Sequence, residues 1–284
     1  MDITPRGVVC SLSVKQWAPN KLDKAATTEV EHDKSVNAGR VKVHKRLVES
    51  KVLAQITKEA AAYRADLNFR TRPWFDDGQR VLPTTGIMAA QDKWHEFRDT
   101  FQALTRTFLD SYPSAVRSAN YELGSLFNQE DYPEVSVVGS KFAADFRIMP
   151  IPTGGDFRAN LSDLEVERIR AKIDADVAAV FRASQVDIWR RLWTVVKPIP
   201  QRLRDYDGGK EGAFRDTLIT NVRDLLAVLS DLNIEGDPDL ENVAKLLAAA
   251  TSVDPKTLRE NEIARNQVAD DAEAILSRIS AFMA

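Results

Sequence analysis

The sequence has little of what several classes of protein require. Its 284 residues include one cysteine, Cys10, which excludes an internal disulfide framework and fits a reducing compartment. The three histidines are scattered, so together with Cys10 they cannot supply a zinc site rich in cysteine or histidine. Apolar runs are no longer than the one at residues 246–250, far short of the roughly 20 residues of a spanning helix. The N-terminus has no basic-then-apolar leader, so we expect no secretion signal.

Motifs of the common enzyme classes are also missing. The sequence GGKEG at residues 208–212 is the nearest match to a phosphate-binding loop, but no strand precedes it and no Ser or Thr follows its lysine. Asp76 and Asp77 form a carboxylate pair, which turn chemistry explains better than metal binding does. Cys10 lies in a predicted strand, where a cysteine is most often an inert core residue. We therefore expect a protein that is not an enzyme and that uses no cofactor or metal.

Two stretches alternate between apolar and polar residues, as half-buried strands do. The first covers residues 8–14, with Val8, Cys10, Leu12 and Val14 on one face. The second covers residues 142–148, with Phe142, Ala144, Phe146 and Ile148 on one face. Because both are short and isolated along the chain, we predict that they pair with each other in a small sheet. Residues 40–44 are a candidate for a further short strand.

Most of the remaining sequence has helical periodicity. Helices are predicted over residues 47–67, from residue 86 to the Tyr112-Pro113 step, over residues 114–127, and through most of the chain after Ser162. Ser162 is a good N-cap, and Asp237-Pro238 and Asp254-Pro255 repeat one signal for the start of a helix. Residues 18–38 have no clear period and predict a loop or arm with one helical turn at most. Residues 72–78, RPWFDDG, predict a turn.

These elements predict an α+β fold that is predominantly helical. A small antiparallel sheet in the N-terminal half would pack on helices, and the C-terminal half would be all helical. We place the boundary in the loop at residues 150–161, which gives an α+β domain at 1–155 and a helical domain at 156–284. Apolar seams at residues 94–108 and 268–282 have heptad-like spacing, which suits either intramolecular hairpins or subunit contacts. We expect a homo-oligomer, because a seam at the end of the chain has few local partners.

Charge is small overall but unevenly distributed. Residues 1–120 carry 19 Lys and Arg against 14 Asp and Glu, whereas the remaining residues carry 20 against 28. The excess is concentrated in residues 40–72, which hold nine bases against three acids. We call residues 40–72 the basic stripe. It predicts a local surface for anions on a mildly acidic protein, and the alternative is a solvated helix face without a partner.

Two tryptophans flank the basic stripe. Trp17 and Trp74 lie beside prolines in predicted loops, where aromatic rings can stack on unpaired bases while lysine and arginine follow the phosphates. The alternative is that both rings close the core beneath loops. The candidate residues for binding nucleic acid are Arg40, Lys42, Lys45, Arg46, Lys51, Lys58, Arg70, Arg72, Trp17 and Trp74.

Several short motifs together resemble a family of largely uncharacterised tailed-bacteriophage proteins, often encoded with early or DNA-metabolism genes. They are LSVKQW at 12–17, KLDK at 21–24, RPWFDDG at 72–78, LP at 82–83, LGSLF at 123–127, DYP at 131–133, PIP at 150–152, DFR at 156–158, DIWRRL at 187–192, LNI at 232–234 and DP at 237–238. The resemblance covers most of the chain. It implies a phage origin and a location in the cytoplasm of the infected host, with no membrane association, and it supplies no catalytic residues.

Two functional hypotheses follow. In the first, the protein is a non-enzymatic accessory of phage DNA metabolism that binds or anneals single-stranded nucleic acid through the basic stripe as an oligomer. In the second, it is a self-assembling structural or adaptor protein that docks a phage-encoded partner, such as a motor ATPase, and binds no nucleic acid. The second hypothesis needs no basic stripe at all.

Overall fold

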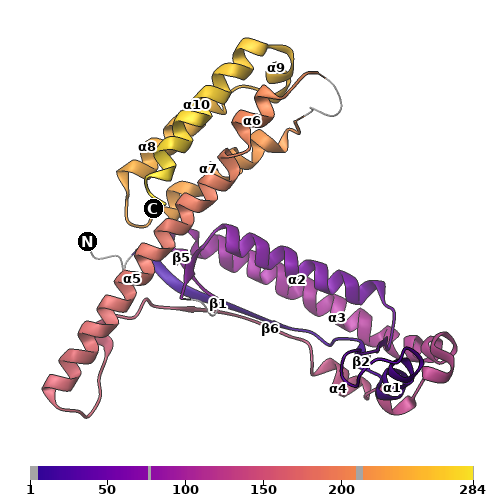
Figure 1. Ribbon diagram of the computed structural model, residues 1–284. Helices are drawn as coiled ribbons and strands as arrows, with labels where there is room; N and C mark the ends of the chain where they lie inside the picture. Colours follow the sequence, from indigo (N-terminus) through magenta and orange to yellow (C-terminus); the bar gives the residue numbers. More distant parts are fainter. Residues whose placement is uncertain (1–5, 76–77, 209–213, 284) are drawn as a thin grey trace. The chain divides into compact units, whose positions relative to one another are not determined.

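The computed structural model describes residues 6–75, 78–208 and 214–283 (Figure 1). The chain divides into two compact units, each assembled from separate segments of the sequence. Unit 1 comprises residues 1–11, 67–88 and 147–284, and unit 2 comprises residues 12–66 and 89–146. The predicted boundary between residues 155 and 156 therefore lies inside unit 1. The chain passes between the units within strands and helices, and not in the loop that its composition suggested.

Four strands form one sheet: β1 (Gly7–Lys15), β4 (Arg72–Trp74), β5 (Gln79–Pro83) and β6 (Ala143–Met149). Their order is β4-β5-β1-β6, and β5 pairs antiparallel with both β1 and β4. The two predicted strands are confirmed, and they are neighbours in the sheet as expected. The predicted turn at residues 72–78 is wrong over Arg72–Trp74, because β4 is an edge strand, where Pro73 can lack an amide without breaking the sheet.

Unit 2 contains a small ribbon and two long helices that lie side by side (Figure 1). Its elements are β2 (Asn20–Leu22), α1 (Lys24–Asp33), β3 (His44–Arg46), most of α2 (Lys51–Phe69) and α3 (Ile87–Leu123), and α4 (Val135–Gly139). Phe97, Phe101 and Phe108 of α3 are buried, and the Phe97 ring stacks on Tyr63 of α2 at 4.6 Å between centroids. The aromatic seam of residues 94–108 is thus an intramolecular core, which decides between the two alternatives for that seam.

Two expectations for unit 2 are wrong. The helix does not stop at Tyr112-Pro113 but continues as α3 to Leu123. Pro113 is exposed, so water can satisfy the Leu109 carbonyl that loses its amide partner. Residues 18–38 hold more structure than one helical turn, because Asp23 accepts a hydrogen bond from the Ala26 amide and caps the ten-residue helix α1.

Unit 1 is mainly helical, which confirms the predicted character of the C-terminal half. It contains α5 (Asp163–Val196), α6 (Ile199–Arg204), α7 (Thr217–Leu232), α8 (Pro238–Ala250), α9 (Pro255–Glu260) and α10 (Glu262–Ser280). Ser162 forms a capping box with Glu165, and Asp237 and Asp254 cap α8 and α9 as expected. The apolar stripes of α5, α7, α8 and α10 form one buried core.

The segment before α5 runs back along the N-terminal half of this helix (Figure 1). The Gly154 amide donates to Asp174 Oδ1 at 2.7 Å. A Cβ on Gly154 would lie 2.7 Å from the Arg170 carbonyl oxygen, whereas one on Gly155 would lie 3.6 Å from Thr153 Oγ1. The chain therefore needs a glycine at residue 154 to approach α5 so closely.

Replacing Gly154 with alanine should displace this segment from α5. We expect Gly154→Ala to cost about 1–3 kcal/mol of stability, as overpacking at a tight contact does. Limited proteolysis should then cut residues 150–162 faster than in the wild type. Gly155→Ala is the matched control, and equal cleavage rates for the two variants would show that the close approach is unimportant.

Candidate nucleic-acid interface

The ten residues predicted to bind nucleic acid differ widely in exposure. Six basic residues are exposed: Arg40, Lys42, Arg46, Lys51, Lys58 and Arg70. Lys45, Arg72 and Trp74 are buried, and Trp17 is half-buried. Arg70, Arg72 and Trp74 belong to unit 1, whereas the other seven belong to unit 2. The basic stripe is therefore split between the units, and only its unit 2 part can form one continuous candidate interface.

Residues 40–47 alternate between exposed and covered side chains. Arg40, Lys42, His44 and Arg46 are exposed, whereas the residues between them are half-buried or buried. The end of this segment is held extended by β3, which pairs antiparallel with β2. Alternate residues of an extended strand lie on one face about 7 Å apart. His44 and Arg46 are alternate residues of β3, and Arg40 and Lys42 precede them in a segment without regular secondary structure. We call these four exposed residues the basic ridge.

The charges of the basic ridge are largely uncompensated. Within the described residues, Arg40, Lys42 and His44 form no ion pair. Arg46 lies 3.7 Å from Glu49, but both side chains are well exposed, and such a pair is weak. Lys51 and Lys58 follow on α2, one heptad apart, so they share one exposed face of that helix.

The inward face of the same ribbon carries a buried ion network. Lys21 and Lys45 lie directly opposite each other across β2 and β3, where like charges repel. Asp131 bridges them, with oxygens 2.5 Å from Lys21 Nζ and 2.7 Å from Lys45 Nζ. Asp23 adds a second carboxylate 3.0 Å from Lys45 Nζ, and Lys45 Nζ donates a further hydrogen bond to the Leu126 carbonyl. The network fixes the ribbon that carries the basic ridge.

This network keeps Lys45 charged but unavailable to a ligand. Burial opposes the charge of Lys45, yet the hydrogen bonds to Asp131 and Asp23 outweigh burial and raise the pKa of Lys45. Burial likewise opposes the charge of Asp131, yet hydrogen bonds from Lys21 and Lys45 lower the pKa of Asp131. The prediction that Lys45 contacts nucleic acid is therefore wrong, because its ammonium group is saturated by partners within unit 2.

Acid should weaken the ribbon through Asp131. The pKa of this carboxyl is below its ordinary value of 3.8, so its contribution to stability is complete above that pH and is lost as the pH falls through the folded-state pKa. We expect the melting temperature, followed by circular dichroism, to fall more steeply below about pH 4 in the wild type than in Asp131→Asn. The same steepness in both proteins would contradict this role.

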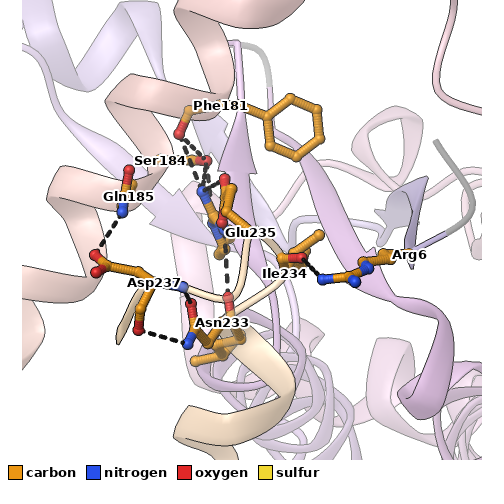
Figure 2. Close-up of polar contacts among 10 residues, drawn as sticks. Arg6, Phe181, Ser184, Gln185, Asn233, Ile234, Glu235 and Asp237 are labelled. Carbon is orange, nitrogen blue, oxygen red and sulfur yellow. Dashed lines mark hydrogen bonds and ion pairs between the residues drawn. The ribbon is translucent and has the colours of Figure 1, made fainter. Parts of the chain in front are cut away.

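Arg72 is fully buried in unit 1, where its guanidinium donates to both carboxylate oxygens of Glu235. It also donates to the Ser184 hydroxyl at 2.6 Å and to the Phe181 carbonyl at 3.0 Å. Figure 2 shows Phe181, Ser184 and Glu235 grouped around these contacts. The prediction that Arg72 binds nucleic acid is wrong, because its donors join β4 to α5 and to the segment after α7.

The segment after α7 is held by further polar contacts (Figure 2). The Asn233 side-chain oxygen accepts from the Asp237 amide at 2.8 Å, and Gln185 of α5 donates to the Asp237 carboxylate at 2.7 Å. Arg6 donates to the Ile234 carbonyl at 3.3 Å. Arg72 is thus the buried centre of a structural network and not part of a binding surface.

Neither tryptophan is placed to stack on a base. Trp74 is 2% exposed, and its ring meets Phe181 edge to face at 5.7 Å in the core of unit 1. Trp17 packs against Phe108 and Tyr112 in unit 2, at 5.9 and 5.6 Å between centroids. The alternative that these rings close the core is therefore correct for Trp74, and Trp17 serves the core of unit 2 in the same way.

Other candidate chemistry lies elsewhere or is inert. Burial raises the pKa of the Cys10 thiol to about 12, so a reactive thiolate does not form at neutral pH. Asp76 and Asp77, and all of the GGKEG loop except Gly208, lie outside the described residues. Among the described residues, no cluster of three or more His, Cys, Asp or Glu could hold a metal ion, and no helix is long and apolar enough to cross a membrane.

Comparison with known proteins identifies no relative. No protein-family model matches the chain, and neither the curated proteins nor the solved structures include a match. The arguments that follow therefore depend on the geometry of the two units alone.

Proposed function

We propose that the protein is a non-catalytic nucleic-acid-binding protein that holds the phosphate backbone of a single strand along the basic ridge. The observation that carries the proposal is the alternation over residues 40–47, which leaves Arg40, Lys42, His44 and Arg46 all exposed. Within β3, alternate side chains such as His44 and Arg46 lie about 7 Å apart, so they can contact different phosphates of one backbone.

The positions of the two tryptophans determine the expected mode of binding. Trp17 and Trp74 are packed in the cores, so base stacking does not contribute. Phosphate contacts position a strand but carry no sequence information. We therefore expect binding that is weak at physiological salt, insensitive to sequence and driven by the release of counterions.

The salt dependence of binding tests this proposal. In fluorescence anisotropy with labelled oligo-dT, each lost phosphate contact should reduce the slope of log affinity against log salt by about 0.7. The variant Arg40→Gln/Lys42→Gln/Arg46→Gln should therefore flatten the slope by about 2 and weaken binding to all single-stranded sequences alike. The matched control neutralises three exposed bases of unit 1, Arg182, Arg190 and Lys197, and should change nothing.

Two outcomes would remove the proposal. The first is no binding of the wild type to single strands at low salt. The second is the same loss of affinity in the control variant, which would indicate a nonspecific effect of net charge. Tighter binding to a duplex of the same length would keep the basic ridge but change its partner.

A second candidate function, an adaptor or self-assembling structural protein, is favoured by α5. None of its buried residues precedes Phe181, and most side chains from Asp163 to Val180 are exposed. Leu161 and Leu164, at its start, are 47% and 80% exposed. If a second copy of the chain packs here, light scattering should give an oligomeric mass that Leu161→Lys/Leu164→Lys reduces. A monomeric wild type would remove the self-assembling form of this candidate.

The proposal includes the place where the protein acts in the cell. The motifs that resemble tailed-phage proteins support a role in the cytoplasm of an infected bacterium, beside other early or DNA-metabolism proteins. Expression of the gene early in infection would support this setting, and expression with late virion genes would favour the structural candidate.

A further inference from the structure

The pocket beside the start of α7 in unit 1 has a distinctive lining. It has a volume of about 430 Å³ and is lined by Arg202, Phe214, Arg215, Thr217, Leu218 and Asn221. None of these side chains is acidic. Each of three other pockets is lined by at least one carboxylate: Asp66 between α2 and α3, Asp131 beside β2, and Glu241 between α7 and α8. Among the described residues, the lining at α7 is thus positive and contains no carboxylate.

The side chains of the two arginines of this pocket have no polar partner within the described part of the protein. The side chains of Arg202 and Arg215 form no hydrogen bond or ion pair there. Arginines nearby are committed: Arg204 contacts Asp270 at 2.7 Å and Glu273 at 2.6 Å, and Arg259 pairs with Asp216. Two guanidinium groups that share one pocket without a counterion favour the binding of an anion between them.

We propose that this pocket binds the phosphoryl group of a small phosphorylated ligand. The planar guanidinium groups of Arg202 and Arg215 can each donate two parallel hydrogen bonds to phosphate oxygens. The Thr217 hydroxyl and the Asn221 amide add neutral donors, and Leu218 offers an apolar side to the organic part of the ligand. The volume lies in the range of small-molecule sites and accommodates a nucleotide.

The inference depends on the cavity and its unpaired arginines. The positive end of the α7 helix dipole also favours an anion, but every helix has such an end, so the dipole is not evidence for this site. Residues 209–213, which precede Phe214 in the chain, are outside the described residues, and the site is defined without them. The pocket belongs to unit 1 and the basic ridge to unit 2, so this inference is independent of the nucleic-acid proposal.

Calorimetric titration with pyrophosphate, ADP and adenosine tests the inference. Wild-type protein should bind pyrophosphate and ADP saturably at constant ionic strength, and should not bind adenosine. Arg202→Gln/Arg215→Gln should weaken the binding of both phosphates by about tenfold or more, because it removes the bidentate donors. Both side chains are exposed, so the melting temperature should stay unchanged.

The control variant Arg182→Gln/Arg190→Gln removes two exposed arginines of the same unit and should bind like the wild type. Three results would overturn the inference: no saturable binding of either phosphate, equal affinity in the wild type and Arg202→Gln/Arg215→Gln, or equal binding of adenosine and ADP. In contrast, if Arg40→Gln/Lys42→Gln/Arg46→Gln loses oligo-dT binding, the result bears on the proposed function and not on the pocket beside α7.

Discussion

Replacing Arg72 with methionine should lower the free energy of unfolding of unit 1 by about 3–5 kcal/mol. The substitution keeps much of the side-chain volume but removes every hydrogen bond to Glu235, Ser184 and the Phe181 carbonyl. It also leaves the Glu235 carboxylate without its cation, and an unpaired charge in that position is what makes a broken buried pair costly. Urea unfolding followed by tryptophan fluorescence measures the change.

Two further variants distinguish the effect of losing the Arg72–Glu235 ion pair from the effect of losing side-chain volume. Adding Glu235→Gln to Arg72→Met should recover part of the stability, because the remaining partner is then neutral. Arg190→Met, on the exposed side of α5, should have little effect. If Arg72→Met is no more destabilising than Arg190→Met, the buried network does not hold β4 to α5.

Trp74→Ala should also destabilise unit 1 by about 3–5 kcal/mol, as the truncation of large buried aromatics does. The indole packs in the core against Phe181, and the neighbouring residues Val81 and Ile234 are buried with it. A ring that stacked on a base would show the opposite pattern, a loss of 1–3 kcal/mol of binding energy per base with little change in stability. Urea unfolding and oligo-dT affinity, measured on the same sample, distinguish the two.

Phe75→Ala is the control for Trp74→Ala. Phe75 is the next residue and touches the Trp74 ring edge to face, but it is 50% exposed. Its truncation should cost much less than that of Trp74. Unchanged stability in Trp74→Ala, with weaker binding of oligo-dT, would return this tryptophan to the nucleic-acid interface.

The elements that the sequence predicts well are those with a local cause. The alternation at residues 8–14 and 142–148 indicates strands, and the caps at Ser162, Asp237 and Asp254 mark the starts of α5, α8 and α9. Each signal lies within a few residues of the feature it predicts. The predominantly helical α+β class follows from the same local periodicities.

The features that the sequence does not predict depend on residues far apart in the chain. Arg72 and Glu235 are 163 residues apart, so nothing beside Arg72 shows that it is buried and paired. Lys45 resembles its exposed neighbours in the basic stripe until its register opposite Lys21 and its contact with Asp131 are known. The short strand predicted at residues 40–44 lies instead at His44–Arg46, so the sequence locates only the end of the basic ridge.

Lysine acylation followed by mass spectrometry, with and without oligo-dT at low salt, tests the central claim most directly. Lys42 is exposed on the basic ridge, Lys197 is exposed in unit 1, and Lys45 is buried in its ion network. We predict that oligo-dT protects Lys42 from acylation and leaves the reactivity of Lys197 unchanged. Lys45 should be unreactive with and without oligo-dT. Unchanged reactivity of Lys42 in a sample that binds oligo-dT would place the strand elsewhere and contradict the account.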